Sequence, residues 1–288
     1  MRLTKILMLL STAIMLATVP SQRRDGAGSA HDGSRKDAAR MYLGFDRNDY
    51  PGDVVLDALR HTFAFCGYWL NAPPGESATN WTGKREILRA HGFGFLVLFN
   101  GRLDKQLTST RNPKLIGAED AQAAVKAAQA DGFARGTVIF VDQEEGGRML
   151  PEQQEYLLAW IDGVNAAGYC AGVYCSGMPD KSGAGGVITA NDIREHAGGR
   201  QISFFVYNDS CPPSPGCIYS AKNITPAQGG VPFATIWQIA QSPQRKSLTR
   251  KCAATYAADG NCYPPGLAVQ GIFVDVDISA SADPSHGR

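Results

Sequence analysis

The chain has 288 residues, enough for one barrel of about 250 residues or for two small domains. Its 28 Lys and Arg residues nearly balance its 27 Asp and Glu residues. The bulk charge therefore gives no indication of a nucleic acid or an anionic membrane surface as partner.

The N-terminus has the pattern of a Sec-type secretory signal. A short basic region over residues 1–5 precedes an apolar run over residues 6–19, which is shorter than the roughly 20 residues of a membrane-spanning helix. We expect a signal peptide over residues 1–21, cleaved between Ala17 and Gln22, and no membrane span after cleavage. Residues 22–40 are rich in Gly, Ser, Asp and Arg and predict a flexible leader. The sequence thus predicts a secreted, periplasmic or cell-envelope protein.

From Met41 onward, short apolar runs alternate with helix-like segments, the pattern of a parallel α/β structure. Eight runs predict strands: Tyr42–Asp46, Phe63–Trp69, Gly94–Phe99, Thr137–Asp142, Tyr169–Tyr174, Ile202–Tyr207, Ala234–Gln238 and Ile272–Asp277. Five segments predict helices: Gly52–His61, Thr82–His91, Gly117–Asp131, Pro151–Ala167 and Asn191–His196.

Eight parallel strands without a break in composition predict a single (β/α)8 TIM-like barrel over residues 41–280, irregular in its last third, with a disordered tail over residues 281–288. A doubly wound open sheet is the main alternative fold. It is disfavoured because no glycine-rich phosphate-binding motif follows the first strand.

The fourth predicted strand ends in an acidic residue, Asp142. Successive side chains of a strand alternate in direction, so Asp142 and Glu144 should project to the same side if the extended backbone persists, with Cα atoms about 6 to 7 Å apart. Each charge then influences the proton affinity of the other, which lets one carboxyl act as a general acid or base while its neighbour stays ionised. A solvated acidic turn is the alternative interpretation.

Active sites of such barrels lie at the carboxyl ends of the strands. Beside Asp142 and Glu144, the acids there are Asp46 at the end of the first strand and Asp275 in the last strand. Other polar and aromatic residues at strand ends are candidates for substrate binding: Tyr68, Trp69, Asn100, Tyr174, Tyr207, Trp237, Gln238 and Asp277. Carboxylates with aromatic rings and amides suit the binding and cleavage of a sugar, although core packing is the alternative for each ring taken singly.

The histidines do not predict a zinc site. His61, His91 and His196 fall at predicted helix ends, while His31 and His286 lie in the tails. Oxygen ligands from Asp46, Asp142, Glu144 and Asp275 leave a calcium or magnesium site as a possible alternative. We expect no metal and no cofactor.

Seven cysteines in an exported chain predict disulfides. Cys211 and Cys217 bracket one Pro-rich turn, and Cys252 and Cys262 bracket another loop, so we expect these two local pairs. Cys170 and Cys175 should not pair, because five extended residues separate them by about 16 Å.

Five motifs together resemble the glycoside-hydrolase-like domain once catalogued as domain of unknown function 1906. They are GFD at 44–46, VDQEEG at 141–146, GYCAGVYCSG at 168–177, IWQIAQ at 236–241 and VDVDIS at 274–279. The chain is similar, more distantly, to family 25 lysozymes, which share the first-strand Asp, the D-x-E and the late W-Q and V-D. The segment at 99–106 and the Cys-rich loops depart from the lysozymes.

The resemblance implies an irregular barrel and an exported protein that acts at the bacterial cell envelope. It also implies roles for single residues: Glu144 as general acid/base, Asp142 as the carboxylate that assists the substrate's acetamido group, and Asp46 and Asp275 as supporting acids. Two hypotheses follow. The first is a hydrolase of peptidoglycan or a related amino-sugar polysaccharide, and the second is a carbohydrate-binding envelope protein without turnover.

Overall fold

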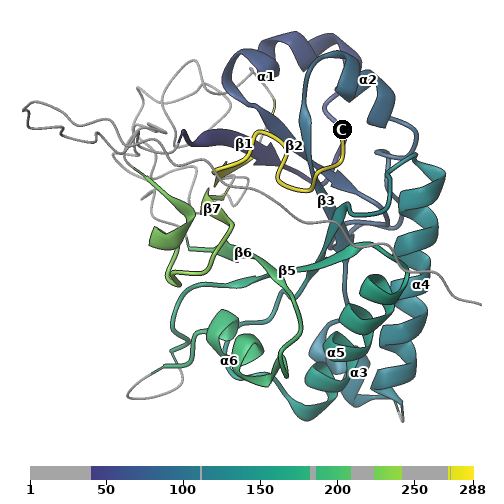
Figure 1. The fold of residues 1–288 in the computed structure, drawn as a ribbon, viewed down its shortest axis with the longest axis vertical. Helices are drawn as coiled ribbons and strands as arrows, with labels where there is room; N and C mark the ends of the chain where they lie inside the picture. Colours follow the sequence, from purple (N-terminus) through teal and green to yellow (C-terminus); the bar gives the residue numbers. More distant parts are fainter. Residues whose placement is uncertain (1–39, 111, 182–185, 209–223, 242–271, 273) are drawn as a thin grey trace, which may run out of the picture. The chain divides into compact units, whose positions relative to one another are not determined.

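Eight strands close into one barrel in chain order (Figure 1). The computed structural model describes residues 40–110, 112–181, 186–208, 224–241, 272 and 274–288, all within one compact unit, Ala38–Arg288. The strands are β1 (Tyr42–Asp46), β2 (Phe65–Trp69), β3 (Gly94–Asn100), β4 (Val138–Asp142), β5 (Cys170–Ser176), β6 (Ser203–Tyr207), β7 (Ile236–Ala240) and β8 (Asp275–Ser279). The predicted single barrel is confirmed.

The direction of the last strand differs from the prediction. Strands β1 to β7 pair in parallel, whereas β8 runs antiparallel to both β1 and β7. The prediction of eight parallel strands is wrong here because an apolar run has the same pattern in either direction. The predicted irregularity of the last third is confirmed, since the β7–β8 register also shifts between Gln238 and Ala240.

Helices lie outside the strands (Figure 1). Their bounds are η1 (Asp53–Val55), α1 (Leu56–Thr62), α2 (Arg85–Ala90), α3 (Asp104–Thr108), α4 (Pro113–Ala130), α5 (Pro151–Ala166), α6 (Thr189–His196) and η2 (Pro226–Gln228). Helix α4 begins four residues before its predicted start because the Asn112 side chain accepts a 3.0 Å hydrogen bond from Leu115 N and Pro113 takes the first helical position.

Helices α4 and α5 pack closely side by side because glycine stands where they meet. A Cβ atom at Gly117 would lie 2.2 Å from the carbonyl oxygen of Tyr156. Next to this contact the buried Asp120 carboxylate accepts two 2.7 Å hydrogen bonds from Arg102 and one of 3.0 Å from the Tyr156 hydroxyl. This ion pair ties the loop after β3 to the helix layer.

The C-terminal segment is ordered against the barrel, so the prediction of a disordered tail over residues 281–288 is wrong. Ser285 is fully buried, and its hydroxyl accepts a 2.8 Å hydrogen bond from Val97 N. The Asp283 carboxylate accepts from the backbone N–H groups of Phe95, Gly287 and Arg288. Backbone and side-chain hydrogen bonds to β3 hold this polar segment, which composition does not reveal.

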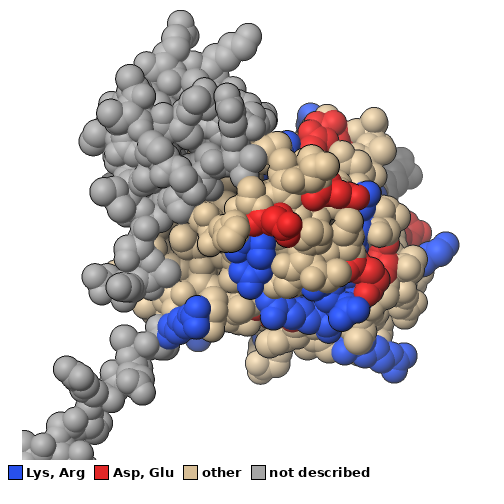
Figure 2. Space-filling model, turned by 90° about the horizontal axis from the view of Figure 1, so that it is seen from above, with Lys and Arg blue, Asp and Glu red and all other residues tan. Residues whose placement is uncertain are grey.

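Charged side chains of both signs lie on the face shown in Figure 2, as the balanced composition predicts. None of the helices in the described ranges has both the length and the apolar character that crossing a membrane requires. The predicted signal peptide, the leader up to Ala39, and the pairs Cys211–Cys217 and Cys252–Cys262 lie outside the described residues.

Candidate active site

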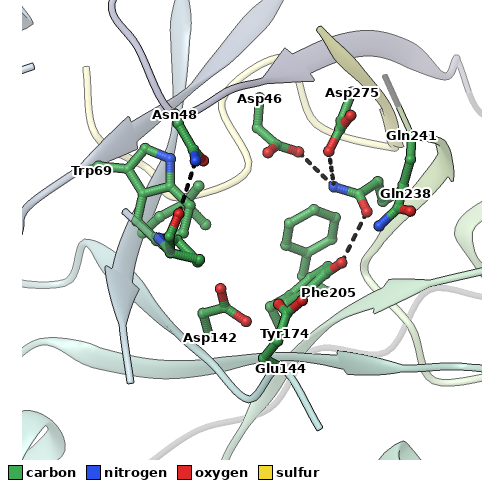
Figure 3. Close-up of a pocket in the computed structure, with 12 residues that line it drawn as sticks. Asp46, Asn48, Trp69, Asp142, Glu144, Tyr174, Phe205, Gln238, Gln241 and Asp275 are labelled. Carbon is green, nitrogen blue, oxygen red and sulfur yellow. Dashed lines mark hydrogen bonds between the residues drawn. The ribbon is translucent and has the colours of Figure 1, made fainter. Parts of the chain in front are cut away.

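One pocket opens at the carboxyl ends of the parallel strands (Figure 3). It encloses about 140 Å³, several times the roughly 15 Å³ that one water molecule needs. Its lining residues are Asp46, Asn48, Trp69, Pro74, Leu98, Asp142, Glu144, Tyr174, Phe205, Gln238, Gln241 and Asp275. The four acids that the sequence analysis singled out thus meet in one pocket.

Asp142 and Glu144 face the pocket together, as the alternation of a strand predicts. Asp142 ends β4 and is buried, whereas Glu144 is exposed in the loop that follows. Burial, then the negative charges of Glu144 and Asp46, raise the pKa of Asp142 well above its usual value. The protonated form of Asp142 is therefore favoured over that of an ordinary aspartate.

Gln238 on β7 joins three lining residues (Figure 3). Its Nε2 donates to Asp46 Oδ2 at 2.8 Å and to Asp275 Oδ2 at 3.3 Å, while its Oε1 accepts from the Tyr174 hydroxyl at 2.9 Å. Burial is the largest influence on Asp46 and raises its pKa to about 6, although the hydrogen bond from Gln238 acts in the opposite direction. The amide therefore orients two carboxylates and favours the ionised form of Asp46.

The reversal of β8 brings Asp275 to the pocket. In the antiparallel β1–β8 ladder Asp275 lies opposite Asp46, so the first residue of β8 meets the last residue of β1. The bulge at Ile239 brings Gln241 to the pocket. Gln241 stands three positions beyond Gln238 and would face the opposite side in a regular strand, yet both residues line the pocket.

A glycine on β2 makes room for Asp46. A Cβ atom at Gly67 would lie 2.6 Å from Asp46 Cβ. The wall beyond is apolar and fixed: Trp69 Nε1 donates to Arg47 O at 3.1 Å, and Asn48 Nδ2 donates to Pro74 O at 3.0 Å. The indole of Trp69 is thus held in place in the lining of the pocket.

Hydrogen bonds from several elements hold the loop that carries Glu144. The Glu145 carboxylate accepts from Asp104 N at the start of α3, at 2.9 Å. On the α6 side, Gly147 N donates to Thr189 Oγ1 at 2.7 Å, and Met149 N donates to the buried carboxylate of Asp192 at 2.9 Å. The backbone on either side of Glu144 is therefore held in place.

Five predicted substrate-binding residues do not line the pocket. Strand alternation turns Tyr68 and Trp237 away from it: Tyr68 packs among Trp81, Phe95 and Phe133, and Trp237 Nε1 donates to Asn208 O. Asn100 is bonded to the loop after β2, donating to Ala72 O at 2.9 Å. Tyr207 ends β6 beyond the lining residue Phe205, and Asp277 is fully buried beneath Asp275.

Five lining residues were not among the predicted site residues: Asn48, Pro74, Leu98, Phe205 and Gln241. The sequence pattern could have predicted Leu98 and Phe205, because each stands two positions before a strand-end residue and so faces the same side of its strand. Gln241 depends on the β7 bulge, which the sequence pattern does not predict.

The described histidines lie away from the pocket. His91 and His196 bond to Asp57 and to the Asp192 carbonyl, and His61 and His286 are exposed. Over the described ranges no group of three or more His, Cys, Asp or Glu side chains is arranged to hold a metal ion.

Cys66, Cys170 and Cys175 are free thiols, which confirms that Cys170 and Cys175 do not pair.

Several solved structures are similar to this chain at low sequence identity. An uncharacterized protein of B. stearothermophilus is 14% identical with a TM-score of 0.47, over 83% of this chain and 95% of that chain. The Mycobacterium tuberculosis Tat-secreted protein Rv2525c, in complex with L-tartrate, is 12% identical with a TM-score of 0.47, over 83% and 94%. The modular autolysin LytC of Streptococcus pneumoniae is 12% identical with a TM-score of 0.47, over 83% and 46%.

No curated protein matches the chain. The family model described as Rv2525c-like, glycoside hydrolase-like domain matches residues 82–180, a range that contains Asp142, Glu144 and Tyr174. The resemblance to the glycoside-hydrolase-like domain that the sequence motifs indicate is therefore confirmed over this range.

Proposed function

We propose that the chain is an exported glycoside hydrolase that cleaves peptidoglycan or a related amino-sugar polysaccharide. One observation carries the proposal: Asp46, Asp142, Glu144 and Asp275 line a single pocket that is walled by Trp69 and Tyr174. Carboxylates on facing sides of a cleft are the equipment for protonating a glycosidic oxygen and for stabilising the positive charge that then develops on the sugar. The match of residues 82–180 to a glycoside hydrolase-like domain supports this assignment.

Glu144 delivers the proton in this mechanism. It is the exposed member of the Asp142–Glu144 pair, so a glycosidic oxygen in the pocket reaches it before Asp142. Asp142, whose pKa burial raises, passes its proton to Glu144, and Glu144 passes it to the leaving oxygen as the glycosidic bond breaks, so both carboxylates are left ionised. Asp142 then stabilises the positive charge on the sugar, directly or through the substrate's own acetamido group.

Asp46 and Asp275 support the reaction from the opposite wall. Gln238 holds both carboxylates in place, and they add negative charge beside the developing cation. Attack by water on the sugar completes the reaction, and the ionised pair takes up a proton from that water, so the pair is restored for the next turnover.

The test is release of reducing ends from purified peptidoglycan and from chitin oligomers by the mature chain. Glu144→Gln should abolish release, because the amide has no proton to deliver, while sugar binding changes only modestly. Glu155→Gln is the matched control, since Glu155 is an exposed carboxylate on α5 away from the pocket, and it should leave the rate unchanged.

If the parent chain and Glu144→Gln bind these polymers equally and neither releases reducing ends, the hydrolase assignment is wrong. The pocket would then belong to a carbohydrate-binding envelope protein.

A further inference from the structure

Asp277 lies beneath the pocket, on the inner side of the barrel. It pairs with Gly44 of β1 and Gln238 of β7, one step below Asp275 on the same face of β8. Its side chain is fully buried and does not line the pocket. A ligand in the pocket meets Asp46 and Asp275 but not Asp277.

The bonding of this buried carboxyl is unusual. Among the residues that the structure describes, no N–H or O–H group donates to either oxygen of Asp277. After burial, the charge of the neighbouring Asp46 carboxyl is the largest influence on its pKa. An ionised Asp277 would be a buried charge without a donor, and only its protonated form has a hydrogen to donate to Asp46.

The groups that face Asp277 leave its charge uncompensated. Asp46 faces it from β1 and Asp275 from its own strand, and both are acidic, while Gln238 on β7 is neutral. Asp46 is in turn influenced by Glu144 across the pocket. A buried carboxylate surrounded by acids would be strongly disfavoured, so the protonated form is the one that this site accepts.

We propose that Asp277 is a positioning residue that keeps a proton in the folded protein and donates it in a hydrogen bond to the Asp46 carboxylate from beneath the pocket. Burial, and after it the charges of Asp46 and Asp275, raise the pKa of Asp277 well above its usual value. The donated bond lowers the pKa of Asp46 and so favours its ionised form. The carboxyl of Asp277 thus lies beneath that of Asp46 at this wall of the pocket, and Asp277 stays neutral.

The proton itself is tested without any substrate. An unfolded Asp is ionised above about pH 5, so folding of the parent chain takes up one proton at Asp277 between pH 5 and pH 7. The folding equilibrium constant, measured by urea denaturation, should therefore fall about tenfold more per pH unit in the parent chain than in Asp277→Asn. The Asn amide keeps a donor for Asp46 and has no proton to gain.

Equal pH dependence in the parent chain and Asp277→Asn would overturn the proposal. Should Asp277→Asn fail to fold, Asp277→Leu serves the same measurement. The carboxyl ¹³C chemical shifts of the parent chain, labelled at aspartate, test the proposal without a variant. If no buried aspartate has the chemical shift of a protonated carboxyl at pH 7, the proposal is wrong.

The effect on the pocket rests on the proposed function. In the reducing-end assay, Asp277→Asn should keep the acid limb of the pH profile in place, because Asn still donates to Asp46. Asp277→Leu should move that limb upward by about one pH unit, because it removes the donor. A purely structural role would move neither limb. If the proton is found but no variant or parent cleaves any polymer, only the hydrolase assignment fails.

Discussion

The side-chain amide of Gln238 donates a 2.8 Å hydrogen bond to the carboxylate of Asp46, which lies 192 positions earlier in the chain. Asp46 ends the first strand and Gln238 lies in the seventh, and β8 stands between them in the closed barrel. Closure of the barrel thus brings the two side chains together. Gln238 is also hydrogen-bonded to Tyr174 and Asp275.

Gln238→Ala should lower activity by about tenfold to a hundredfold. The substitution removes the donor shared by two carboxylates, and hydrogen bonds to charged groups contribute about 1.5 to 3 kcal/mol each. The pKa of Asp46 should rise as well, since the bond from Gln238 acts to lower it. Both effects are measured in the reducing-end assay as a function of pH.

Tyr174→Phe should lower activity less than Gln238→Ala does. It removes only the hydroxyl that donates to Gln238 Oε1, a neutral bond of about 1 kcal/mol, so activity should fall about fivefold. A loss as large as that of Gln238→Ala would contradict the arrangement in which Gln238 is held mainly by the two carboxylates.

Gly67→Ala should displace Asp46. The new Cβ would lie 2.6 Å from Asp46 Cβ, and relief of such overpacking costs about 1 to 3 kcal/mol of stability. Gly172→Ala is the matched control, because its Cβ would meet the Phe140 ring at 2.4 Å instead of an acid. Thermal denaturation should show a loss for both variants, whereas only Gly67→Ala should change the pH profile of cleavage. An unchanged profile in Gly67→Ala would show that Asp46 tolerates the extra methyl group.

The sequence predicted the site best where a strand pattern alone decides the outcome. The run VIFVD is apolar and β-branched, so its strand was placed within one residue, and alternation correctly set Asp142 and Glu144 on one side. Alternation did not separate Trp69 from Tyr68, because both faces of a barrel strand are apolar: one packs inside and the other packs under helices.

Strand direction and tertiary contacts could not be predicted from the pattern. The run that forms β8 has the same alternation whether it is parallel or antiparallel, so Asp275 and Asp277 were assigned to the carboxyl end although β8 begins at Asp275. The order of residues 281–288 depends on hydrogen bonds to β3, nearly 190 positions away, which local composition does not encode.

Asp192→Ala should loosen the loop that carries Glu144. It leaves the buried Met149 N–H without its acceptor, and a buried unsatisfied donor costs about 1 to 3 kcal/mol. We expect this loss in urea denaturation, with a lower kcat and little change in KM. Arg148→Met removes only the exposed partner of Asp192, whose side chain is 66% exposed, and should cost less than about 1 kcal/mol. Equal losses in the two variants would contradict the role given to the Met149 bond.

Asp46 should make the stability of the protein depend on pH between about 4 and 7. Its folded-state pKa, about 6, lies above its ordinary value of 3.8, so the folded chain binds this proton more tightly than the unfolded chain does. The resulting stabilisation is fully present below pH 3.8 and is lost as the pH rises through about 6. A shift of about two pKa units corresponds to about 3 kcal/mol.

Urea denaturation at pH 4 and pH 7 checks this for the parent chain and Asp46→Asn. The parent chain should lose about 2 kcal/mol more than Asp46→Asn between the two pH values, because part of the stabilisation is already lost at pH 4 and the amide does not titrate. Asp46→Asn also removes a charge that raises the pKa of Asp142 and Asp277, so the difference measures Asp46 together with its coupling to these two carboxyls. A parent chain that gains stability from pH 4 to pH 7 relative to the variant would mean that Asp46 is ionised more readily in the fold than in the unfolded chain. Its carboxylate would then be solvated or paired, not buried behind Gln238.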